Sequence, residues 1–96
     1  MNIFISQPMK GKTDAEIQRE REKATLTAVR EYGSDVKILD SYIRGFTGNP
    51  VQYLGRAVEL LGSADAAMFL PGWKDARGCR IERAVCKEYG IPVCME

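Results

Sequence analysis

Short runs of continuous apolar residues alternate along the chain with longer segments in which apolar residues recur every three or four positions. The short runs predict buried β-strands, because a strand that is covered on both faces is apolar at successive positions. The longer segments predict amphipathic helices with one buried face. The expected strands are residues 3–5, 36–39, 65–70 and 91–95, and the expected helices are residues 14–32, 50–61 and 79–89.

The boundaries of the expected helices carry residues that favour helix ends. Thr13 and Glu16 have the spacing of a capping box, in which each side chain accepts a hydrogen bond from the backbone N–H of the other. Asn49 followed by Pro50 is typical of an N-cap and a first helical position. A glycine follows each helix and fits its C-terminus: Gly33, Gly62 and Gly90.

The same spacing predicts which helix faces are buried. The polar run of residues 18–23 in the first helix is expected to face solvent. The residues expected to point inward are Ile17, Ala24, Ala28 and Val29 in the first helix, Val51, Leu54, Val58 and Leu61 in the second, and Ile81, Val85 and Tyr89 in the third.

The order of the elements predicts an α/β fold. Short connections through helices make neighbouring strands parallel, so we expect a small open parallel sheet of about four strands with helices on both faces, a three-layer arrangement of the flavodoxin or Rossmann kind. Residues 1–96 are expected to form one domain. Ligands bind such sheets beyond the carboxyl ends of the strands. This rule selects three loops, residues 6–12, 40–49 and 71–78.

Composition narrows the chemistry. The 96 residues include no histidine, which excludes Ser-His-Asp and Cys-His catalysis and most zinc sites. Lys and Arg number 14 and Asp and Glu number 13, for a net charge of +1. A near-neutral chain lacks the overall positive potential that attracts nucleic acids and anionic membranes, so we expect neither as a partner.

The cysteines and the N-terminus indicate the compartment. Three cysteines, Cys79, Cys86 and Cys94, fit reduced thiols, and their spacing matches no metal motif. No apolar run approaches the roughly twenty residues of a membrane span, and the first residues lack the features of a secretion signal. We therefore expect a cytoplasmic protein without a metal or an organic cofactor.

The third loop and the helix after it carry two carboxylates. Glu82 lies one turn into the helix and would lean back toward the crevice, and Asp75 lies on the approaching loop. Two carboxylates at one crevice can divide nucleophilic and proton-transfer roles. The alternative is a structural role, in which the helix dipole stabilises a negative charge at Glu82, or Glu82 pairs with Arg77 or Arg80 on the surface.

The other two loops carry candidate binding residues, each with an alternative structural role. Lys10 and Gly11 precede a helix N-terminus and suit a phosphate, although loop lysines are often merely solvated. Asp40 follows a strand, where its carboxylate can accept hydrogen bonds from ribose hydroxyl groups or can cap the turn that follows. Three aromatic loop residues can stack on a base or cover the core: Tyr42, Phe46 and Trp73.

The chain resembles small phage and bacterial proteins described as nucleoside 2-deoxyribosyltransferase-like, which mostly have no assigned function. The resemblance covers nearly the whole chain. It rests on residues 3–11 (Ile-Phe-Ile-Ser-Gln-Pro-Met-Lys-Gly) and 72–82 (Gly-Trp-Lys-Asp-Ala-Arg-Gly-Cys-Arg-Ile-Glu). Through that group it extends to characterised deoxyribosyltransferases and nucleotide N-glycosidases.

The resemblance implies roles for individual residues. Glu82 would be the nucleophile that attacks the anomeric carbon, and Asp75 would assist the base. Arg77 stands where the family has an Asp and Cys79 where it has a Thr, and the family also takes a site residue from a neighbouring subunit just beyond the last strand, which this chain is expected to lack. The expected substrate-binding residues are Ser6, Gln7, Lys10, Gly11, Asp40, Gly72, Trp73, Arg77 and Gly78.

Three hypotheses about function follow. The first is an enzyme that cleaves the N-glycosidic bond of a nucleoside or nucleotide, or transfers its deoxyribosyl group. The second is a non-catalytic domain that binds or senses a nucleotide or nucleotide-sugar in the same crevice. The third is a module that contacts another protein. A thin core and the resemblance both favour a homo-oligomer.

Overall fold

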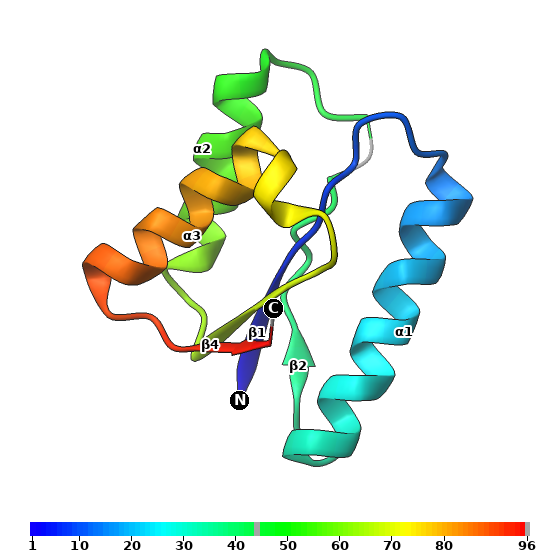
Figure 1. The fold of residues 1–96 in the computed structure, drawn as a ribbon, viewed down its shortest axis with the longest axis vertical. Coiled ribbons are helices and arrows are strands. Elements are labelled where there is room, and N and C mark those ends of the chain that lie inside the picture. Colours follow the sequence, from blue (N-terminus) through cyan, green and yellow to red (C-terminus); the bar gives the residue numbers. More distant parts are fainter. Residues whose placement is uncertain (44, 96) are drawn as a thin grey trace.

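The computed structural model describes residues 1–43 and 45–95, and these residues form a single layered α/β unit (Figure 1). The elements follow the predicted alternation of strands and helices. In chain order they are β1 (Asn2–Ser6), α1 (Asp14–Tyr32), β2 (Lys37–Ile38), α2 (Pro50–Leu61), β3 (Ala66–Phe69), the single-turn 3₁₀ helix η1 (Trp73–Asp75), α3 (Arg77–Tyr89) and β4 (Val93–Met95).

The four strands form one parallel sheet in the order β2-β1-β3-β4. The predicted open parallel sheet is confirmed. Its two central strands, β1 and β3, pair from Ile3 opposite Ala66 to Ser6 opposite Phe69. The chain leaves β1 toward one edge and β3 toward the other, so the strand order reverses between them. At such a point the loops beyond the strands diverge and leave a crevice.

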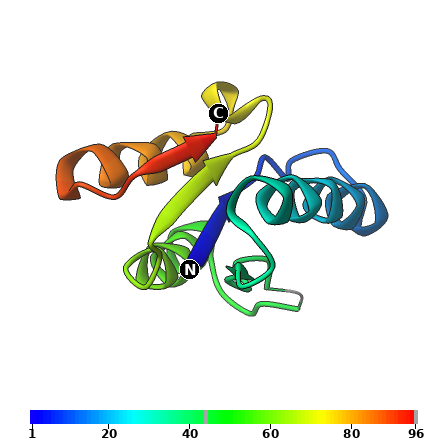
Figure 2. The same ribbon diagram turned by 90° about the horizontal axis from the view of Figure 1, so that it is seen from below.

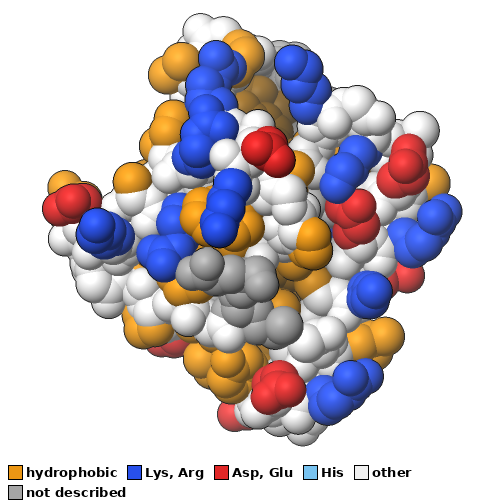
Figure 3. Space-filling view, viewed as in Figure 1, with side chains coloured by type: hydrophobic (Ala, Val, Ile, Leu, Met, Phe, Trp, Pro, Cys, Tyr) orange, Lys and Arg blue, Asp and Glu red, His pale blue; other side chains and the backbone are white. Residues whose placement is uncertain are grey.

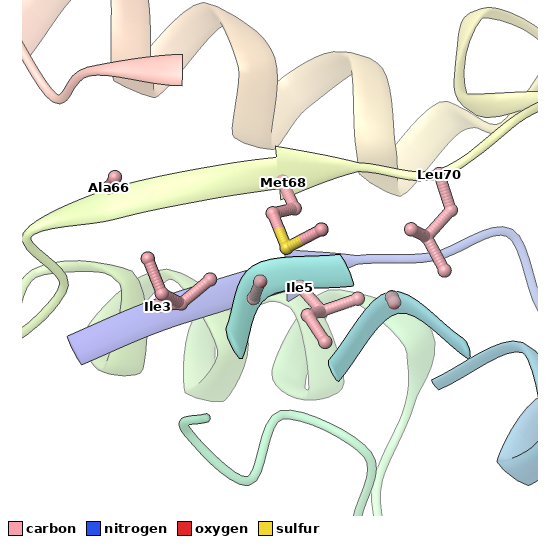
Figure 4. Packing of buried hydrophobic residues seen from close by; sticks show 7 residues of the cluster. Ile3, Ile5, Ala66, Met68 and Leu70 are labelled. Carbon is pink, nitrogen blue, oxygen red and sulfur yellow. The ribbon is translucent and has the colours of Figure 1, made fainter. Parts of the chain in front are cut away.

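Helices cover both faces of the sheet, as Figure 2 shows with α1 on one side and α2 and α3 on the other. Successive residues of β1 therefore point into different cores, with Ile3 and Ile5 toward α1 and Phe4 toward α2 and α3. Figure 4 shows the α1 side. The buried residues of that cluster are Ile3, Ile5, Ala24, Ala28, Ala66, Met68 and Leu70, and those of the other are Phe4, Ala57, Leu61, Ala67, Phe69 and Cys86.

The helix ends follow the sequence signals closely. Thr13 and Glu16 form the predicted capping box, and Asn49 forms a second one with Gln52. Gly90 ends α3 with φ near +70°, a conformation that glycine adopts without strain. β1 extends one residue beyond the prediction at each end, and β2, β3 and β4 are shorter than predicted. α3 begins at Arg77 rather than at residue 79.

The predicted inward faces of the helices need correction. Val29, Val51, Ile81 and Tyr89 are exposed, with Val51 75% and Tyr89 81% accessible. Polar residues occupy buried positions instead: Arg21, which lies inside the run expected to be solvated, is 8% exposed, and Glu82 is 7% exposed. The faces of α1 and α3 that contact the sheet carry small residues, Ala24 and Ala28 on α1 and Cys79 and Cys86 on α3, so the larger apolar side chains lie on the flanks. Val51 lies in the first turn of α2, at the cleft.

No helix in the described part of the chain is long and apolar enough to cross a membrane.

Candidate functional site

A cleft of about 1000 Å³ lies at the carboxyl ends of β1 and β3. Its walls are the loop after β1, the segment from Gly72 to the first turns of α3, and the first two turns of α2. This is the place where the strand order reverses. The rule applied to the sequence selected the edge of the sheet at which this cleft lies.

Glu82 forms part of the cleft wall although it is almost completely buried. Cys79, Glu82 and Cys86 follow each other at spacings of three and four on α3, so all three face the sheet. Ser6, at the end of β1, donates a hydrogen bond of 2.6 Å from its Oγ to Glu82 Oε1. A carboxyl group is thus held between α3 and β1, one of the two central strands of the sheet.

Burial changes the acidity of this group. Removal from water raises the pKa of Glu82 to about 7, and the hydrogen bond from Ser6 acts in the opposite direction by favouring the ionised form. Near neutral pH the carboxyl group is therefore close to half ionised. A strongly perturbed carboxyl group in a cleft is a frequent feature of functional sites.

Charged residues surround the mouth of the cleft. Asp75 and Arg77 come from the segment after β3 and Lys10 comes from the loop after β1, and all three are exposed. Gly78 lies in the first turn of α3, where backbone N–H groups have no partner within the helix. Figure 3 shows mainly Lys and Arg side chains over the α2–α3 half of one face, with some acidic side chains among them, whereas basic and acidic side chains alternate over α1. This arrangement suits an anionic group on a ligand.

Gly72 gives the loop after β3 its shape. It has φ of +89°, and a side chain there would place Cβ 3.6 Å from Pro8 Cγ. The turn brings the segment from β3 beside the loop from β1, and η1 follows directly. Gly72 therefore helps to form the cleft through its backbone conformation.

Gln7 lines the cleft and also anchors the loop after β1. Its Nε2 donates to Ile17 O at 2.9 Å and to Glu20 Oε1 at 3.0 Å, and its Oε1 accepts from Arg21 at 3.4 Å. Lys12 forms an ion pair with Glu20 at 2.9 Å. Of the two lysines in this loop, Lys12 is thus used within the fold, and Lys10 faces the cleft.

Four predicted binding residues lie outside the cleft wall formed by the described residues: Ser6, Gly11, Asp40 and Trp73. Ser6 contacts the Glu82 carboxyl group, which does line the cleft. Trp73 packs on Phe69 with ring centroids 5.4 Å apart, which favours the alternative of a cover over the core. Gly11, with φ of +78°, shapes the turn before α1. Asp40 is exposed, and its charge favours the ionised form of Arg21, while burial lowers the pKa of that guanidinium.

The other two aromatic candidates also make contacts within the protein. Tyr42 donates a hydrogen bond to Asp14 through its hydroxyl group. Phe46 packs edge to face against Tyr53, with centroids 5.3 Å apart. Both contacts brace the loop that follows β2.

Sequence reasoning missed Ser41 and Tyr53, which also line the cleft. Ser41 is buried and donates to Ile5 O at 3.0 Å, and Tyr53 Oη donates to Ser41 O at 3.3 Å. Together they tie α2 and the loop after β2 to the end of β1. The available signal was the position of Ser41 just after a strand, in a loop already selected.

Metal binding has no obvious place in the described residues, where no three Cys, Asp or Glu side chains gather in a way that could hold an ion. The three cysteines are free thiols.

The fold and the cleft define a small doubly wound α/β domain with a cleft at its topological switch point. The chain belongs to the family described as "Domain of unknown function (DUF4406)", whose model matches residues 1–95. No curated protein and no solved structure matches the chain.

Proposed function

We propose that this protein cleaves the N-glycosidic bond of a nucleoside or nucleotide, or transfers its deoxyribosyl group, with Glu82 as the nucleophile. The observation that carries the proposal is the buried Glu82 carboxyl group, held by Ser6 at 2.6 Å in the cleft at the switch point. The resemblance of residues 3–11 and 72–82 to nucleoside 2-deoxyribosyltransferase-like proteins supports the same chemistry.

The first step forms a bond between a Glu82 carboxylate oxygen and C1′ of the sugar. The bond from C1′ to the base nitrogen breaks through an oxocarbenium-like transition state, and its electron pair leaves with the base. Asp75, or a water molecule that it holds, supplies the proton that the departing base takes up. Asp75 suits this role because it is solvent-accessible and lines the same cleft as Glu82.

The second step releases the sugar. Water attacks C1′ of the ester on Glu82, transfers a proton to Asp75, and regenerates the carboxylate, as in a retaining glycosidase. A second base in place of water gives deoxyribosyl transfer. Lys10, Arg77 and the free N–H groups near Gly78 would hold a 5′-phosphate, because all three lie at the mouth of the cleft.

A second candidate function is non-catalytic binding of a nucleotide or nucleotide-sugar. Two observations favour it. Arg77 replaces the Asp of the resembled enzymes. The pKa of Glu82, raised to about 7 by burial, keeps part of the carboxyl groups protonated at neutral pH. A protonated carboxyl group donates one hydrogen bond and accepts another, which suits the edge of a base.

Base release from a panel of deoxynucleosides and deoxynucleotides, with and without a second free base, tests both candidates. For the enzyme we expect release that is lost in Glu82→Gln and kept in Glu88→Gln, since Glu88 is exposed on the same helix. Binding without release, retained in Glu82→Gln, would establish the second candidate. If the protein neither releases a base nor binds any member of the panel, both candidates are refuted.

We also propose that the protein is a homo-oligomer without nucleic acid or membrane partners. Support comes from exposed apolar side chains on the two helices beside the cleft: Val51 on α2 and Ile81 and Tyr89 on α3. Sedimentation velocity of the purified protein tests this directly. A single species of 10.7 kDa at micromolar concentration would refute it.

A further inference from the structure

The two oxygens of the Glu82 carboxyl group have different surroundings. Oε1 accepts the hydrogen bond from Ser6 Oγ. Within residues 1–43 and 45–95 no hydrogen bond to Oε2 is found, and Glu82 lines the cleft. One oxygen is therefore held by the sheet, while the other keeps its capacity to accept a hydrogen bond.

The central sheet fixes the position of Ser6. Ser6 is the last residue of β1, pairs with Phe69 of β3, and is fully buried. Its hydroxyl group also opposes the rise in the pKa of the Cys79 thiol that burial causes, one turn before Glu82 on α3. A hydroxyl group held by a central strand loses little freedom when it binds a carboxylate.

A serine hydroxyl has one hydrogen to donate. In this structure that hydrogen goes to Glu82 Oε1, so it is not available to a ligand in the cleft. That Ser6 binds substrate directly stays a prediction; in this geometry it cannot donate to a substrate while it donates to Glu82. The contact instead acts on the carboxyl group, whose orientation decides which oxygen faces the cleft.

We propose that Ser6 is a positioning residue that holds Oε1 of Glu82 and thereby presents Oε2 to the ligand. The inference rests on the proposed function in one respect, that the group presented to Oε2 is C1′ of a sugar. The rest of the inference, that Ser6 sets the orientation and ionisation of Glu82, stands on the contact alone.

Other charged and titratable groups around Glu82 do not replace this contact. Burial raises the pKa of the Cys79 and Cys86 thiols on the same helix, so both stay neutral near pH 7. The positive charge of Arg83 opposes the rise in the pKa of the Cys86 thiol, and the Arg83 guanidinium group lies over the Phe69 ring. The charged groups that line the cleft around Glu82 are Lys10, Asp75, Arg77 and Arg80.

The first test follows the ionisation of Glu82 and needs no enzymatic activity. The ¹³C signal of the Glu82 side-chain carboxyl group is titrated in the wild type, Ser6→Ala, Ser6→Thr and Thr25→Val. Thr25 is a matched control, because its hydroxyl group donates to Arg21 O at 2.8 Å on α1. We expect the pKa of Glu82 to rise above the wild-type value of about 7 only in Ser6→Ala. An unchanged titration in Ser6→Ala overturns the inference.

The second test separates positioning from stability. With the nucleoside or nucleotide that the wild type turns over, Ser6→Ala should lower kcat on the order of tenfold and leave KM within about twofold. The acid limb of the kcat profile should move to higher pH, and Ser6→Thr should restore most of the rate. Equal losses in Ser6→Ala and Thr25→Val would instead mark a general structural effect and overturn the inference.

The two proposals fail in different ways. If the wild type releases no base, the proposed function fails, and the carboxyl titration still decides whether Ser6 controls Glu82. If Ser6→Ala does not fold, Ser6→Cys serves in its place, because a thiol is a weaker donor of similar size. We then expect the same upward shift in the titration of Glu82, and its absence overturns the inference.

Discussion

Glu82 accepts a 2.6 Å hydrogen bond from Ser6 inside the contact between α3 and β1, so a carboxyl group occupies a buried position that cysteines occupy elsewhere on the same helix face. An apolar residue at position 82 would pack there without the cost of burying a charge. The protein therefore carries a local loss of stability at the cleft. Losses of this kind are typical of functional sites.

Glu82→Gln should stabilise the fold at pH 8. The pKa of Glu82 is raised from 4.5 to about 7 by burial, so the folded state binds the proton more tightly than the unfolded state. The stability of the wild type is then highest below about pH 4.5 with respect to this group, falls as the pH rises toward 7, and is flat above. The whole change amounts to roughly 3 kcal/mol. The amide introduced by Glu82→Gln stays neutral at every pH, so the advantage of the variant should appear above pH 7 and shrink toward pH 5.

Urea unfolding at pH 5 and pH 8 measures this difference in the free energy of unfolding. Glu88→Gln serves as the control, because Glu88 is exposed on the same helix and should show no such pH dependence. A Glu82→Gln variant that is less stable than the wild type at pH 8 contradicts the prediction.

The fold could be predicted because several local signals agree. The continuous apolar runs, the capping box at Thr13 and the Asn49-Pro50 start each define an element, and together they predict an open parallel sheet. The strand order β2-β1-β3-β4 comes from the structure. The carboxyl ends of parallel strands lie at one edge in any order, so Asp75, Arg77 and Glu82 could be selected before their contacts were known.

The contacts within the site could not be predicted in the same way. Hydrophobicity alone places a Glu on the outside of α3, yet Glu82 is buried because Ser6 supplies a hydrogen bond from 76 residues away in the chain. For Trp73 the sequence left two roles open, stacking on a ligand and covering the core, and in the structure the ring packs on Phe69. These outcomes depend on side-chain packing in three dimensions, which the local sequence pattern does not encode.

The two lysines of the loop after β1 should have different roles. Lys12 is paired with Glu20 at 2.9 Å, whereas Lys10 lines the cleft. We expect Lys10→Ala to weaken binding of a 5′-phosphorylated nucleotide on the order of tenfold and to leave binding of the matching nucleoside within about twofold. Lys12→Ala should have a smaller effect on both.

Isothermal titration calorimetry with a deoxynucleotide and its nucleoside makes this comparison, preferably in the Glu82→Gln background to prevent turnover. The difference between the two ligands isolates the phosphate contact. Equal losses for nucleotide and nucleoside in Lys10→Ala would falsify the assignment of Lys10 to the phosphate.

Leu61 and Val51 should respond very differently to truncation, although the sequence pattern placed both on the inward face of α2. Leu61 is fully buried against the sheet, and Val51 is 75% exposed in the first turn. We expect Leu61→Ala to cost about 2–5 kcal/mol of unfolding free energy and Val51→Ala to stay within about 0.5 kcal/mol. Thermal and urea unfolding of the two variants measure this, and similar losses would show that α2 is rotated relative to the structure described.

Trp73 should contribute to stability and not to ligand binding. Its ring packs on Phe69, and Lys74 lies over it at 5.7 Å from the ring centroid. We expect Trp73→Ala to lower the unfolding free energy by about 1–3 kcal/mol, since the side chain is only partly buried, and to leave the KM or Kd of the ligand within about twofold. Trp73 is the sole tryptophan, so its fluorescence also shows whether a ligand stacks on its ring. A base that stacked on this ring would quench the emission in proportion to occupancy, whereas a base bound in the cleft should leave the intensity nearly constant. Strong saturable quenching, together with loss of binding in Trp73→Ala, would return Trp73 to the ligand site.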